Sequence, residues 1–315
     1  MARKTQRWFG IGEWYGRLFT AITAEERRQL AQIAQQPINS AHTPQCPFRG
    51  TPKERPLCKK RGGVCTLRLY QVVDGQATPA SDPGVLRTVC PHRFREDDKI
   101  IAWVGKTVLG HPEPYVVEQV PFLQKQESPR VAKEGKNTTK LTGRIDMILI
   151  HPDLSRFSWC ALETQAVYFS GKTMNEDFAR ILSATDAEVS STRLSRRPDY
   201  RSSTVKRLLP QLQIKVGALM RWEKKLAVVT DHAFYNALGE IDEVDDISNC
   251  DIVWFVVKYE ISSPDRAALR PDSIHYTTLE KTVSALTGRT PLPKADFEKR
   301  IIDKLNRLLK AKAAE

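Results

Sequence analysis

Apolar residues dominate two short runs near the middle of the chain, Gly143–Ile150 and Trp159–Tyr168. Both runs are rich in β-branched, aromatic and aliphatic residues, which favour strands. The residues between the runs include proline, aspartate and serine, which favour turns. The pattern predicts a β-hairpin.

The register of this hairpin follows from the position of its turn. A turn centred midway between Leu154 and Ser155 sets Asp146 opposite Glu163, because the two strands run in opposite directions. Successive side chains of a strand point to alternate faces, so Glu163 and Gln165 project the same way. We therefore expect one polar face that carries aspartate, glutamate and glutamine.

Helical spacing of apolar residues predicts helices on both sides of the hairpin. Thr23 and Glu26 form a capping box ahead of a helix that reaches about Gln35 and ends at the proline two residues further on. Leucine and valine recur at helical spacing through Thr204–Trp222. Pro210 either kinks this helix or starts its main part.

Two further strands and a last helix complete the pattern. Leu226–Thr230 and Asp251–Ile261 are strand candidates that would extend the sheet, and the second is apolar enough for burial on both faces. The last helix either packs on its own domain or forms a dimer contact. Its apolar stripe consists of Phe297, Ile301, Leu305 and Leu308. These elements indicate one elaborated α/β domain.

The paired carboxylates of the hairpin carry the first candidate chemistry. Asp146 and Glu163 would repel each other in apolar surroundings unless a cation lies between them. Oxygen ligands suit a hard ion such as Mg²⁺, which can lower the pKa of a bound water and stabilise charge on a phosphoryl oxygen. The alternative is a surface hairpin with scattered polar residues.

Four of the six cysteines lie in a short stretch rich in proline, glycine and basic residues. Such a stretch buries little core, and a metal held by four thiolates would brace it. The four are Cys46, Cys58, Cys65 and Cys90, and His92 could replace one thiolate. Disulfides are the alternative, but we see no signal peptide and expect a reducing, cytoplasmic compartment. Cys160 and Cys250 lie in apolar runs, and we expect them to be buried hydrophobic residues.

Charge points to a polyanionic partner. The chain has 49 Lys and Arg against 37 Asp and Glu, a net charge of +12. A basic cluster could neutralise phosphates or read guanine, although a solvated basic loop is the alternative. Its members are Arg193, Arg196, Arg197, Arg201, Lys206 and Arg207. No long apolar span or lipidation signal favours a membrane.

These motifs together resemble a known family. Asp146 followed by Glu163-Thr164-Gln165 is similar to the PD-(D/E)XK nuclease core, in the variant with glutamine in place of lysine. With the four cysteines, the chain resembles the NotI-type restriction endonucleases. The resemblance also includes Ile11–Gly16, Glu163–Tyr168 and Arg197–Ser203.

The resemblance implies a PD-(D/E)XK core, a mixed central sheet flanked by helices, with a metal-braced, loop-rich subdomain. Residues 1–40 would form an N-terminal helical segment, 41–107 the four-cysteine subdomain and 108–315 the catalytic and DNA-recognition core. The structural metal would be iron, although four thiolates by themselves suit zinc equally.

Site residues carry over by position. Asp146 and Glu163 would hold Mg²⁺, and Gln165 would position water at the place of the usual lysine. Glu118 is the candidate for a further upstream acidic residue, and Glu127 and Glu134 also lie between it and Asp146. The alternative for Glu118 is a solvent-facing residue on an edge strand.

The implied activity is that of a type II restriction endonuclease. It would act as a homodimer on double-stranded DNA and hydrolyse a GC-rich palindrome. Two alternatives remain open. One is a repair or mobile-element PD-(D/E)XK nuclease without palindrome specificity, and the other is a non-catalytic, metal-braced DNA-binding protein.

Overall fold

A computed structural model describes most of the chain. The described residues are 7–38, 41–74, 76–80, 86–125, 140–171, 173–185, 196–288 and 292–312. Arg193, Glu127 and Glu134 lie outside these ranges.

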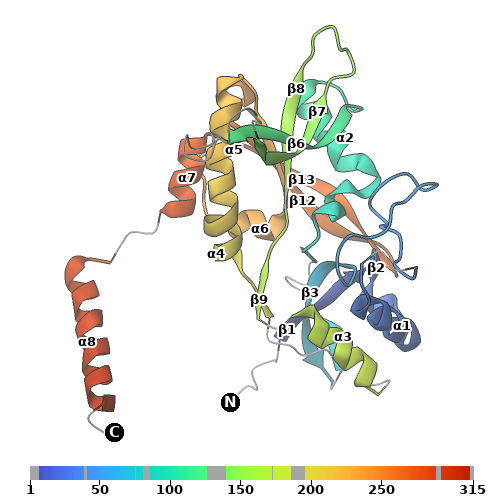
Figure 1. Cartoon of the computed structure of the whole chain (residues 1–315), viewed down its shortest axis with the longest axis vertical. Helices are drawn as coiled ribbons and strands as arrows, with labels where there is room; N and C mark the ends of the chain where they lie inside the picture. Colours follow the sequence, from blue (N-terminus) through green and yellow to red (C-terminus); the bar gives the residue numbers. More distant parts are fainter. Residues whose placement is uncertain are drawn as a thin grey trace, which may run out of the picture.

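A mixed six-stranded sheet forms the centre of the molecule (Figure 1). Its strand order is β13-β12-β11-β8-β7-β6, and β11 runs parallel to both β8 and β12, whereas the other pairs are antiparallel. The strands are β6 (Tyr115–Lys125), β7 (Lys140–Ile150), β8 (Trp159–Gln165), β11 (Leu226–Asp231), β12 (Ile252–Ser263) and β13 (Arg266–Thr277). The predicted strands are confirmed, and so is the α/β class.

The predicted hairpin register is confirmed. Strands β7 and β8 pair Met147 with Leu162 and Ile150 with Trp159, which is the register expected from the turn position. One position beyond Met147, the backbone N–H of Asp146 donates to the side chain of Glu163 at 3.0 Å. The two carboxylate residues therefore lie side by side where the ladder ends.

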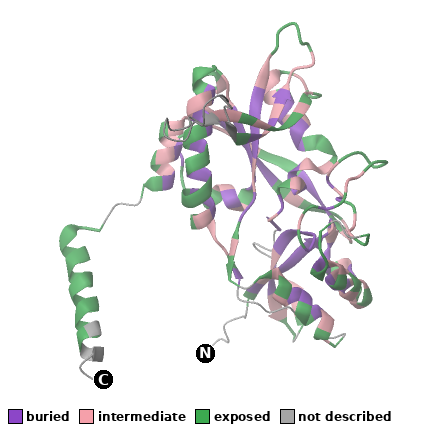
Figure 2. Ribbon diagram, in the orientation of Figure 1, coloured by how far each residue is buried: buried purple, intermediate pink, exposed green. Residues whose placement is uncertain are grey.

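Helices cover both faces of the central sheet. On one face, α2 (Lys99–Leu109) packs Ile100, Ile101 and Val104 into a core shared with Leu149. On the other face, α5 (Leu209–Arg221) and α7 (Leu279–Thr287) contribute to a second core. Figure 2 shows buried residues along the central strands and the inner sides of these helices.

Both helix predictions are confirmed. Helix α1 (Ala24–Gln35) begins with the Thr23 capping box. Pro210 lies in the first turn of α5, so it starts the main part of the helix. Ahead of it run α4 (Tyr200–Ser203) and one π-helical turn (Thr204–Leu208).

A second sheet joins the two amino-terminal segments. Its strands are β1 (Arg7–Trp14), β2 (Arg17–Leu18), β3 (Val64–Val73), β4 (Gln76–Pro79) and β5 (Arg87–Thr88). Residues 41–107 form the cysteine-rich segment. Because β1 pairs with β3, this segment shares backbone hydrogen bonds with the segment before it. Helices α1 and α3 (Met174–Ser183) pack beside this sheet.

Buried polar contacts attach the second sheet to the central one. Arg93 donates from Nε to Glu13 at 2.9 Å and from Nη2 to the carbonyl of Ala267 at 2.8 Å. The backbone N–H of Thr88 donates to Asp231 at 2.8 Å, and its carbonyl accepts from the backbone N–H of Val167 at 2.9 Å. These contacts fix the cysteine-rich segment against the carboxyl ends of β8 and β11.

Short elements complete the described chain. They are β9 (Phe169–Gly171), β10 (Arg196–Pro198), α6 (His232–Asn236) and 3-10 turns at Phe19–Ala21, Pro91–Asp98 and Ile247–Asn249. Among the described residues, no helix has the length and apolar character needed to cross a membrane.

The last helix, α8 (Lys294–Lys312), forms as predicted but does not pack on the domain. Phe297 is 56% exposed, and Ile301 and Leu305 are each 50% exposed. Figures 1 and 2 show α8 standing apart from the rest of the molecule. The expectation of domain packing was therefore wrong, because helical periodicity identifies an apolar stripe but not the surface that covers it. The side chain of Leu308 lies outside the described residues.

Candidate active site

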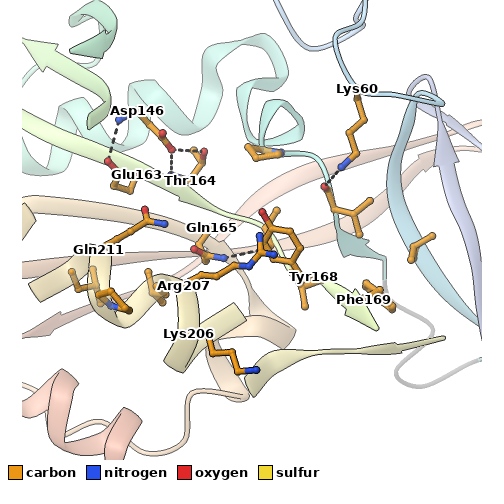
Figure 3. A pocket seen from close by; sticks show the side chains of 18 of the residues that line it. Lys60, Asp146, Glu163, Thr164, Gln165, Tyr168, Phe169, Lys206, Arg207 and Gln211 are labelled. Atoms are coloured by element: carbon orange, nitrogen blue, oxygen red, sulfur yellow. Dashed lines mark hydrogen bonds between the residues drawn. The ribbon is translucent and has the colours of Figure 1, made fainter. Parts of the chain in front are cut away.

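A cleft of about 740 Å³ opens at the end of β8 (Figure 3). Strand β8 supplies one wall and α5 another, and the cysteine-rich segment closes the side through Lys60 and Arg61. Asp146, Glu163, Thr164 and Gln165 all line this cleft. The residues that the hairpin pattern predicted to lie together therefore line one cleft.

Asp146 and Glu163 are held by hydrogen bonds across the end of the ladder. The backbone N–H of Asp146 donates to Oε1 of Glu163, and the backbone N–H of Thr164 donates to Oδ2 of Asp146 at 3.3 Å. The Thr164 hydroxyl donates to the same Asp146 oxygen at 3.4 Å. Each carboxylate is thus oriented by a backbone group of the opposite strand (Figure 3).

The electrostatics of this pair favour a cation. Glu163 is 7% exposed, and its burial, with the nearby Asp146 carboxylate, raises its pKa to about 7. Lys215 opposes this rise, because its Nζ lies 2.6 Å from Oε1 of Glu163. Two adjacent carboxylates in a cleft reachable by solvent suit a hard divalent ion.

Gln165 lies in the cleft beside Glu163, as the alternation of side chains predicted. Its Nε2 donates to the carbonyl of Ala166 at 2.7 Å, and its own backbone carbonyl accepts from the Thr230 hydroxyl at 3.1 Å. The side-chain Oε1 is the acceptor that could orient a water.

Glu118 approaches Asp146 from the other side of the hairpin. It shares with Asp146 and His92 a smaller cavity of about 200 Å³. Its carboxylate forms an ion pair with Arg95. Glu118, the candidate upstream acidic residue, therefore lies near Asp146 but lines a different cavity from Glu163.

The basic cluster divides into a cleft group and a structural residue. Lys206 and Arg207 line the cleft, and the Arg207 guanidinium lies 3.4 Å from the centroid of the Tyr168 ring. Arg197 and Arg201 are exposed outside it. Arg196 is 5% exposed and forms an ion pair with Asp177, so we remove it from the candidate DNA surface.

Sequence reasoning missed Lys215, Lys60 and Arg61. Lys215 had a detectable signal, because it lies on the buried side of α5 between Leu212 and Leu219. A lysine within such an apolar stripe is seldom buried without a partner. The two residues on the cysteine-rich segment face the cleft through tertiary packing, for which the sequence held no signal.

The four predicted cysteines are brought into one buried region. Each is a free thiol no more than 6% exposed. Burial raises the pKa of the Cys58 thiol to about 11, and the nearby Cys46 and Cys90 add to the rise. Thiolates in such a place need a cation, so the donors fit a soft or borderline metal. Among the described residues, however, no group of three or more His, Cys, Asp or Glu side chains stands in metal-binding geometry.

Comparison with known proteins settles the family. The family model described as Restriction endonuclease NotI matches residues 27–268. The chain belongs to this family. The match includes every cleft-lining residue named above and all four cysteines of the predicted site, whereas α7 and α8 lie beyond it. No curated protein matches the chain. Membership in the NotI family makes the chain a restriction-endonuclease relative and hence a nuclease.

Proposed function

We propose that this protein is a type II restriction endonuclease that hydrolyses double-stranded DNA with Mg²⁺. The observation that carries the proposal is the pair Asp146 and Glu163, held side by side in a cleft whose walls carry Lys60, Lys206 and Arg207. Acidic metal ligands beneath basic walls match the needs of phosphodiester chemistry. The core would be of the PD-(D/E)XK kind, in its glutamine variant.

Each side chain has a defined task in this proposal. Asp146 and Glu163 would hold the metal, which would lower the pKa of a bound water and stabilise negative charge on the phosphoryl group. Gln165 would orient the attacking water through Oε1, because an amide accepts a hydrogen bond but carries no charge. Glu118 would act as a further acidic residue from the neighbouring cavity.

The basic walls would hold the DNA backbone. Lys206 and Arg207 line the cleft, and the exposed Arg197 and Arg201 extend the positive surface beyond it. Phosphate contacts fix register, whereas contacts with base edges supply specificity. By resemblance to the family, the target would be a GC-rich palindrome, and the arginines would then be candidates for reading guanine.

A palindrome presents two equivalent strands, and a twofold dimer meets this symmetry with one cleft per strand. We therefore propose a homodimer. We also propose that Cys46, Cys58, Cys65 and Cys90 hold a structural metal, iron by resemblance and zinc as the alternative. The metal would brace the segment that brings Lys60 to the cleft.

Digestion of high-GC genomic DNA by the purified protein with Mg²⁺, followed by sequencing of fragment ends, tests the proposal. We expect discrete ends that share one palindrome and carry 5′-phosphates. Random ends would favour a repair or mobile-element nuclease. Intact DNA, with binding retained, would favour a non-catalytic DNA-binding protein.

A further inference from the structure

A buried lysine on α5 contacts the candidate metal ligand. Lys215 is 7% exposed, and its Nζ lies 2.6 Å from Oε1 of Glu163 and 3.3 Å from Oε1 of Gln211. It also lines the cleft that contains Asp146 and Gln165. The ammonium group therefore stands at the point where the candidate active-site carboxylates meet the helix.

Position along α5 argues that this lysine is placed there by the fold. Leu212, Val216 and Leu219 on the same side of the helix belong to the core beneath the central sheet. A lysine in this stripe takes a large, charged group out of water, which is costly without a partner. Glu163 is that partner, and it is itself buried beside a second carboxylate.

The charge of Lys215 complements a deficit in the motif. Glu163-Thr164-Gln165 carries a neutral amide two residues after the glutamate. An amide can orient water but cannot offset negative charge that develops on a phosphoryl group. Lys215 reaches the same cleft from a different element, so its charge is fixed within the site before any ligand arrives.

We propose that Lys215 is a positioning residue of the active site: it holds the Glu163 carboxylate at the cleft and brings from α5 the positive charge that the Glu-x-Gln motif lacks. This role rests on the proposed nuclease function. In the metal-free protein Lys215 offsets the repulsion between Glu163 and Asp146. During cleavage it would lower the electrostatic cost of charge gathering in the cleft.

The test compares Lys215→Met with Lys215→Arg. Methionine keeps most of the aliphatic volume and removes the charge, whereas arginine keeps the charge. Lys294→Met is the matched control, because the Lys294 side chain is 88% exposed on α8, outside the cleft. Single-turnover cleavage is measured at saturating Mg²⁺ and saturating DNA, and DNA affinity is measured with Ca²⁺.

We expect Lys215→Met to lower the single-turnover rate by about 100-fold and to change the DNA dissociation constant by less than about 3-fold. Lys215→Arg should recover most of the rate, and Lys294→Met should match the wild type. Wild-type rates for Lys215→Met would overturn the proposal. So would an arginine variant that folds but cuts no better than the methionine variant.

A second readout needs neither metal nor activity. Thermal unfolding of the metal-free protein is measured for Lys215→Met, Glu163→Gln and the double variant. We expect Lys215→Met to lower Tm by about 5 °C in the wild-type background and by less than half of that in the Glu163→Gln background. Equal shifts in the two backgrounds would contradict the pairing.

The two readouts separate the possible failures. If the wild type does not cut DNA, the proposed function fails, and the unfolding comparison still decides whether Lys215 holds Glu163. If Lys215→Met does not fold, Lys215→Gln replaces it in both experiments, because glutamine keeps a polar group beside Glu163 and Gln211. Cleavage at the wild-type rate by that variant would equally overturn the proposal.

Discussion

At the residue scale, the candidate site depends on a few side chains whose environments differ sharply. Glu163 is buried between Asp146 and Lys215, whereas Lys206 and Arg207 are exposed on the cleft wall. The sequence placed the two carboxylates and Gln165 on one face through the position of the hairpin turn and strand alternation, and the family resemblance implied their roles. It could not identify Lys215 as their partner, because that contact joins β8 to α5 and depends on tertiary packing.

Arg207 and Arg196 make a matched pair for testing the DNA surface. Arg207→Ala should weaken DNA binding and reduce its dependence on salt, because one phosphate contact fewer releases fewer counterions. The slope of log affinity against log salt concentration should fall by about 0.9 for one lost contact. Filter binding over a range of salt concentrations measures this slope.

Arg196→Met serves as the contrast. Because Arg196 is paired with buried Asp177, its replacement should lower the free energy of unfolding by about 3 kcal/mol and leave the salt slope unchanged. A changed slope with normal stability would return Arg196 to the DNA surface.

At the element scale, the sequence predicted structure wherever capping or turn residues marked the end of a helix or strand. The capping box at Thr23 fixed the start of α1, and the turn residues fixed the register of β7 and β8. Arg196 and α8 show where local signals fail. The sequence of a basic run does not show which of its charged residues is buried. The apolar stripe of a helix likewise does not show whether another surface covers it.

The capping box of α1 allows a direct test of how much a local signal contributes to stability. Thr23→Ala removes the side chain that accepts from the backbone N–H of Glu26, and should lower the free energy of unfolding by about 1 kcal/mol. Chemical denaturation measures this difference at neutral pH. A difference near zero would show that α1 is held by packing alone.

The same variant has a defined pH dependence. Hydrogen bonds from Arg17 and from Thr23 lower the pKa of Glu26 from 4.5 to about 2, so its ionised form stabilises the folded state above pH 4.5. That contribution is lost as the pH falls towards 2. The Thr23 hydroxyl donates one of these hydrogen bonds to Glu26, and Thr23→Ala removes it. The difference in unfolding free energy between the wild type and Thr23→Ala should therefore narrow over this pH range, and a constant difference would contradict the assignment.

The cysteine-rich segment is the element whose order should depend on metal. Cys58→Ser should release the bound metal and lower Tm, because a metal that binds only the folded segment stabilises that fold. Elemental analysis of purified protein gives the metal content and distinguishes iron from zinc. Cys160→Ser is the control, since Cys160 is 1% exposed within the separate core of the central sheet. Unchanged metal content in Cys58→Ser would argue against the four-cysteine site.

At the scale of the whole molecule, the second sheet and the central sheet meet at the cleft. Arg93 and Thr88 join the two, so the cysteine-rich segment contributes Lys60 and Arg61 to the same opening as β8 and α5. The sequence predicted that these parts form separate segments, with boundaries after residues 40 and 107. It could not show that strand pairing and buried ion pairs would unite them.

A homodimer is the assembly that the proposed cleavage of a palindrome requires. Light scattering after size-exclusion chromatography should give a mass of twice 35.8 kDa for the wild type. If α8 forms the dimer contact, the double variant Ile301→Asp with Leu305→Asp should shift this mass towards that of the monomer. The double variant Ala295→Asp with Asn306→Asp adds the same two negative charges at exposed, non-stripe positions of α8 and serves as the control.

Cleavage of one DNA substrate by the wild type, Asp146→Ala and Glu163→Ala tests whether these two carboxylates form the active site. Each protein is assayed with Mg²⁺ for cutting and with Ca²⁺ for binding. We expect the wild type to cut with Mg²⁺, both variants to lose cleavage by at least about 100-fold, and all three proteins to bind DNA comparably with Ca²⁺. Full cleavage by either variant would contradict the assignment of the active site.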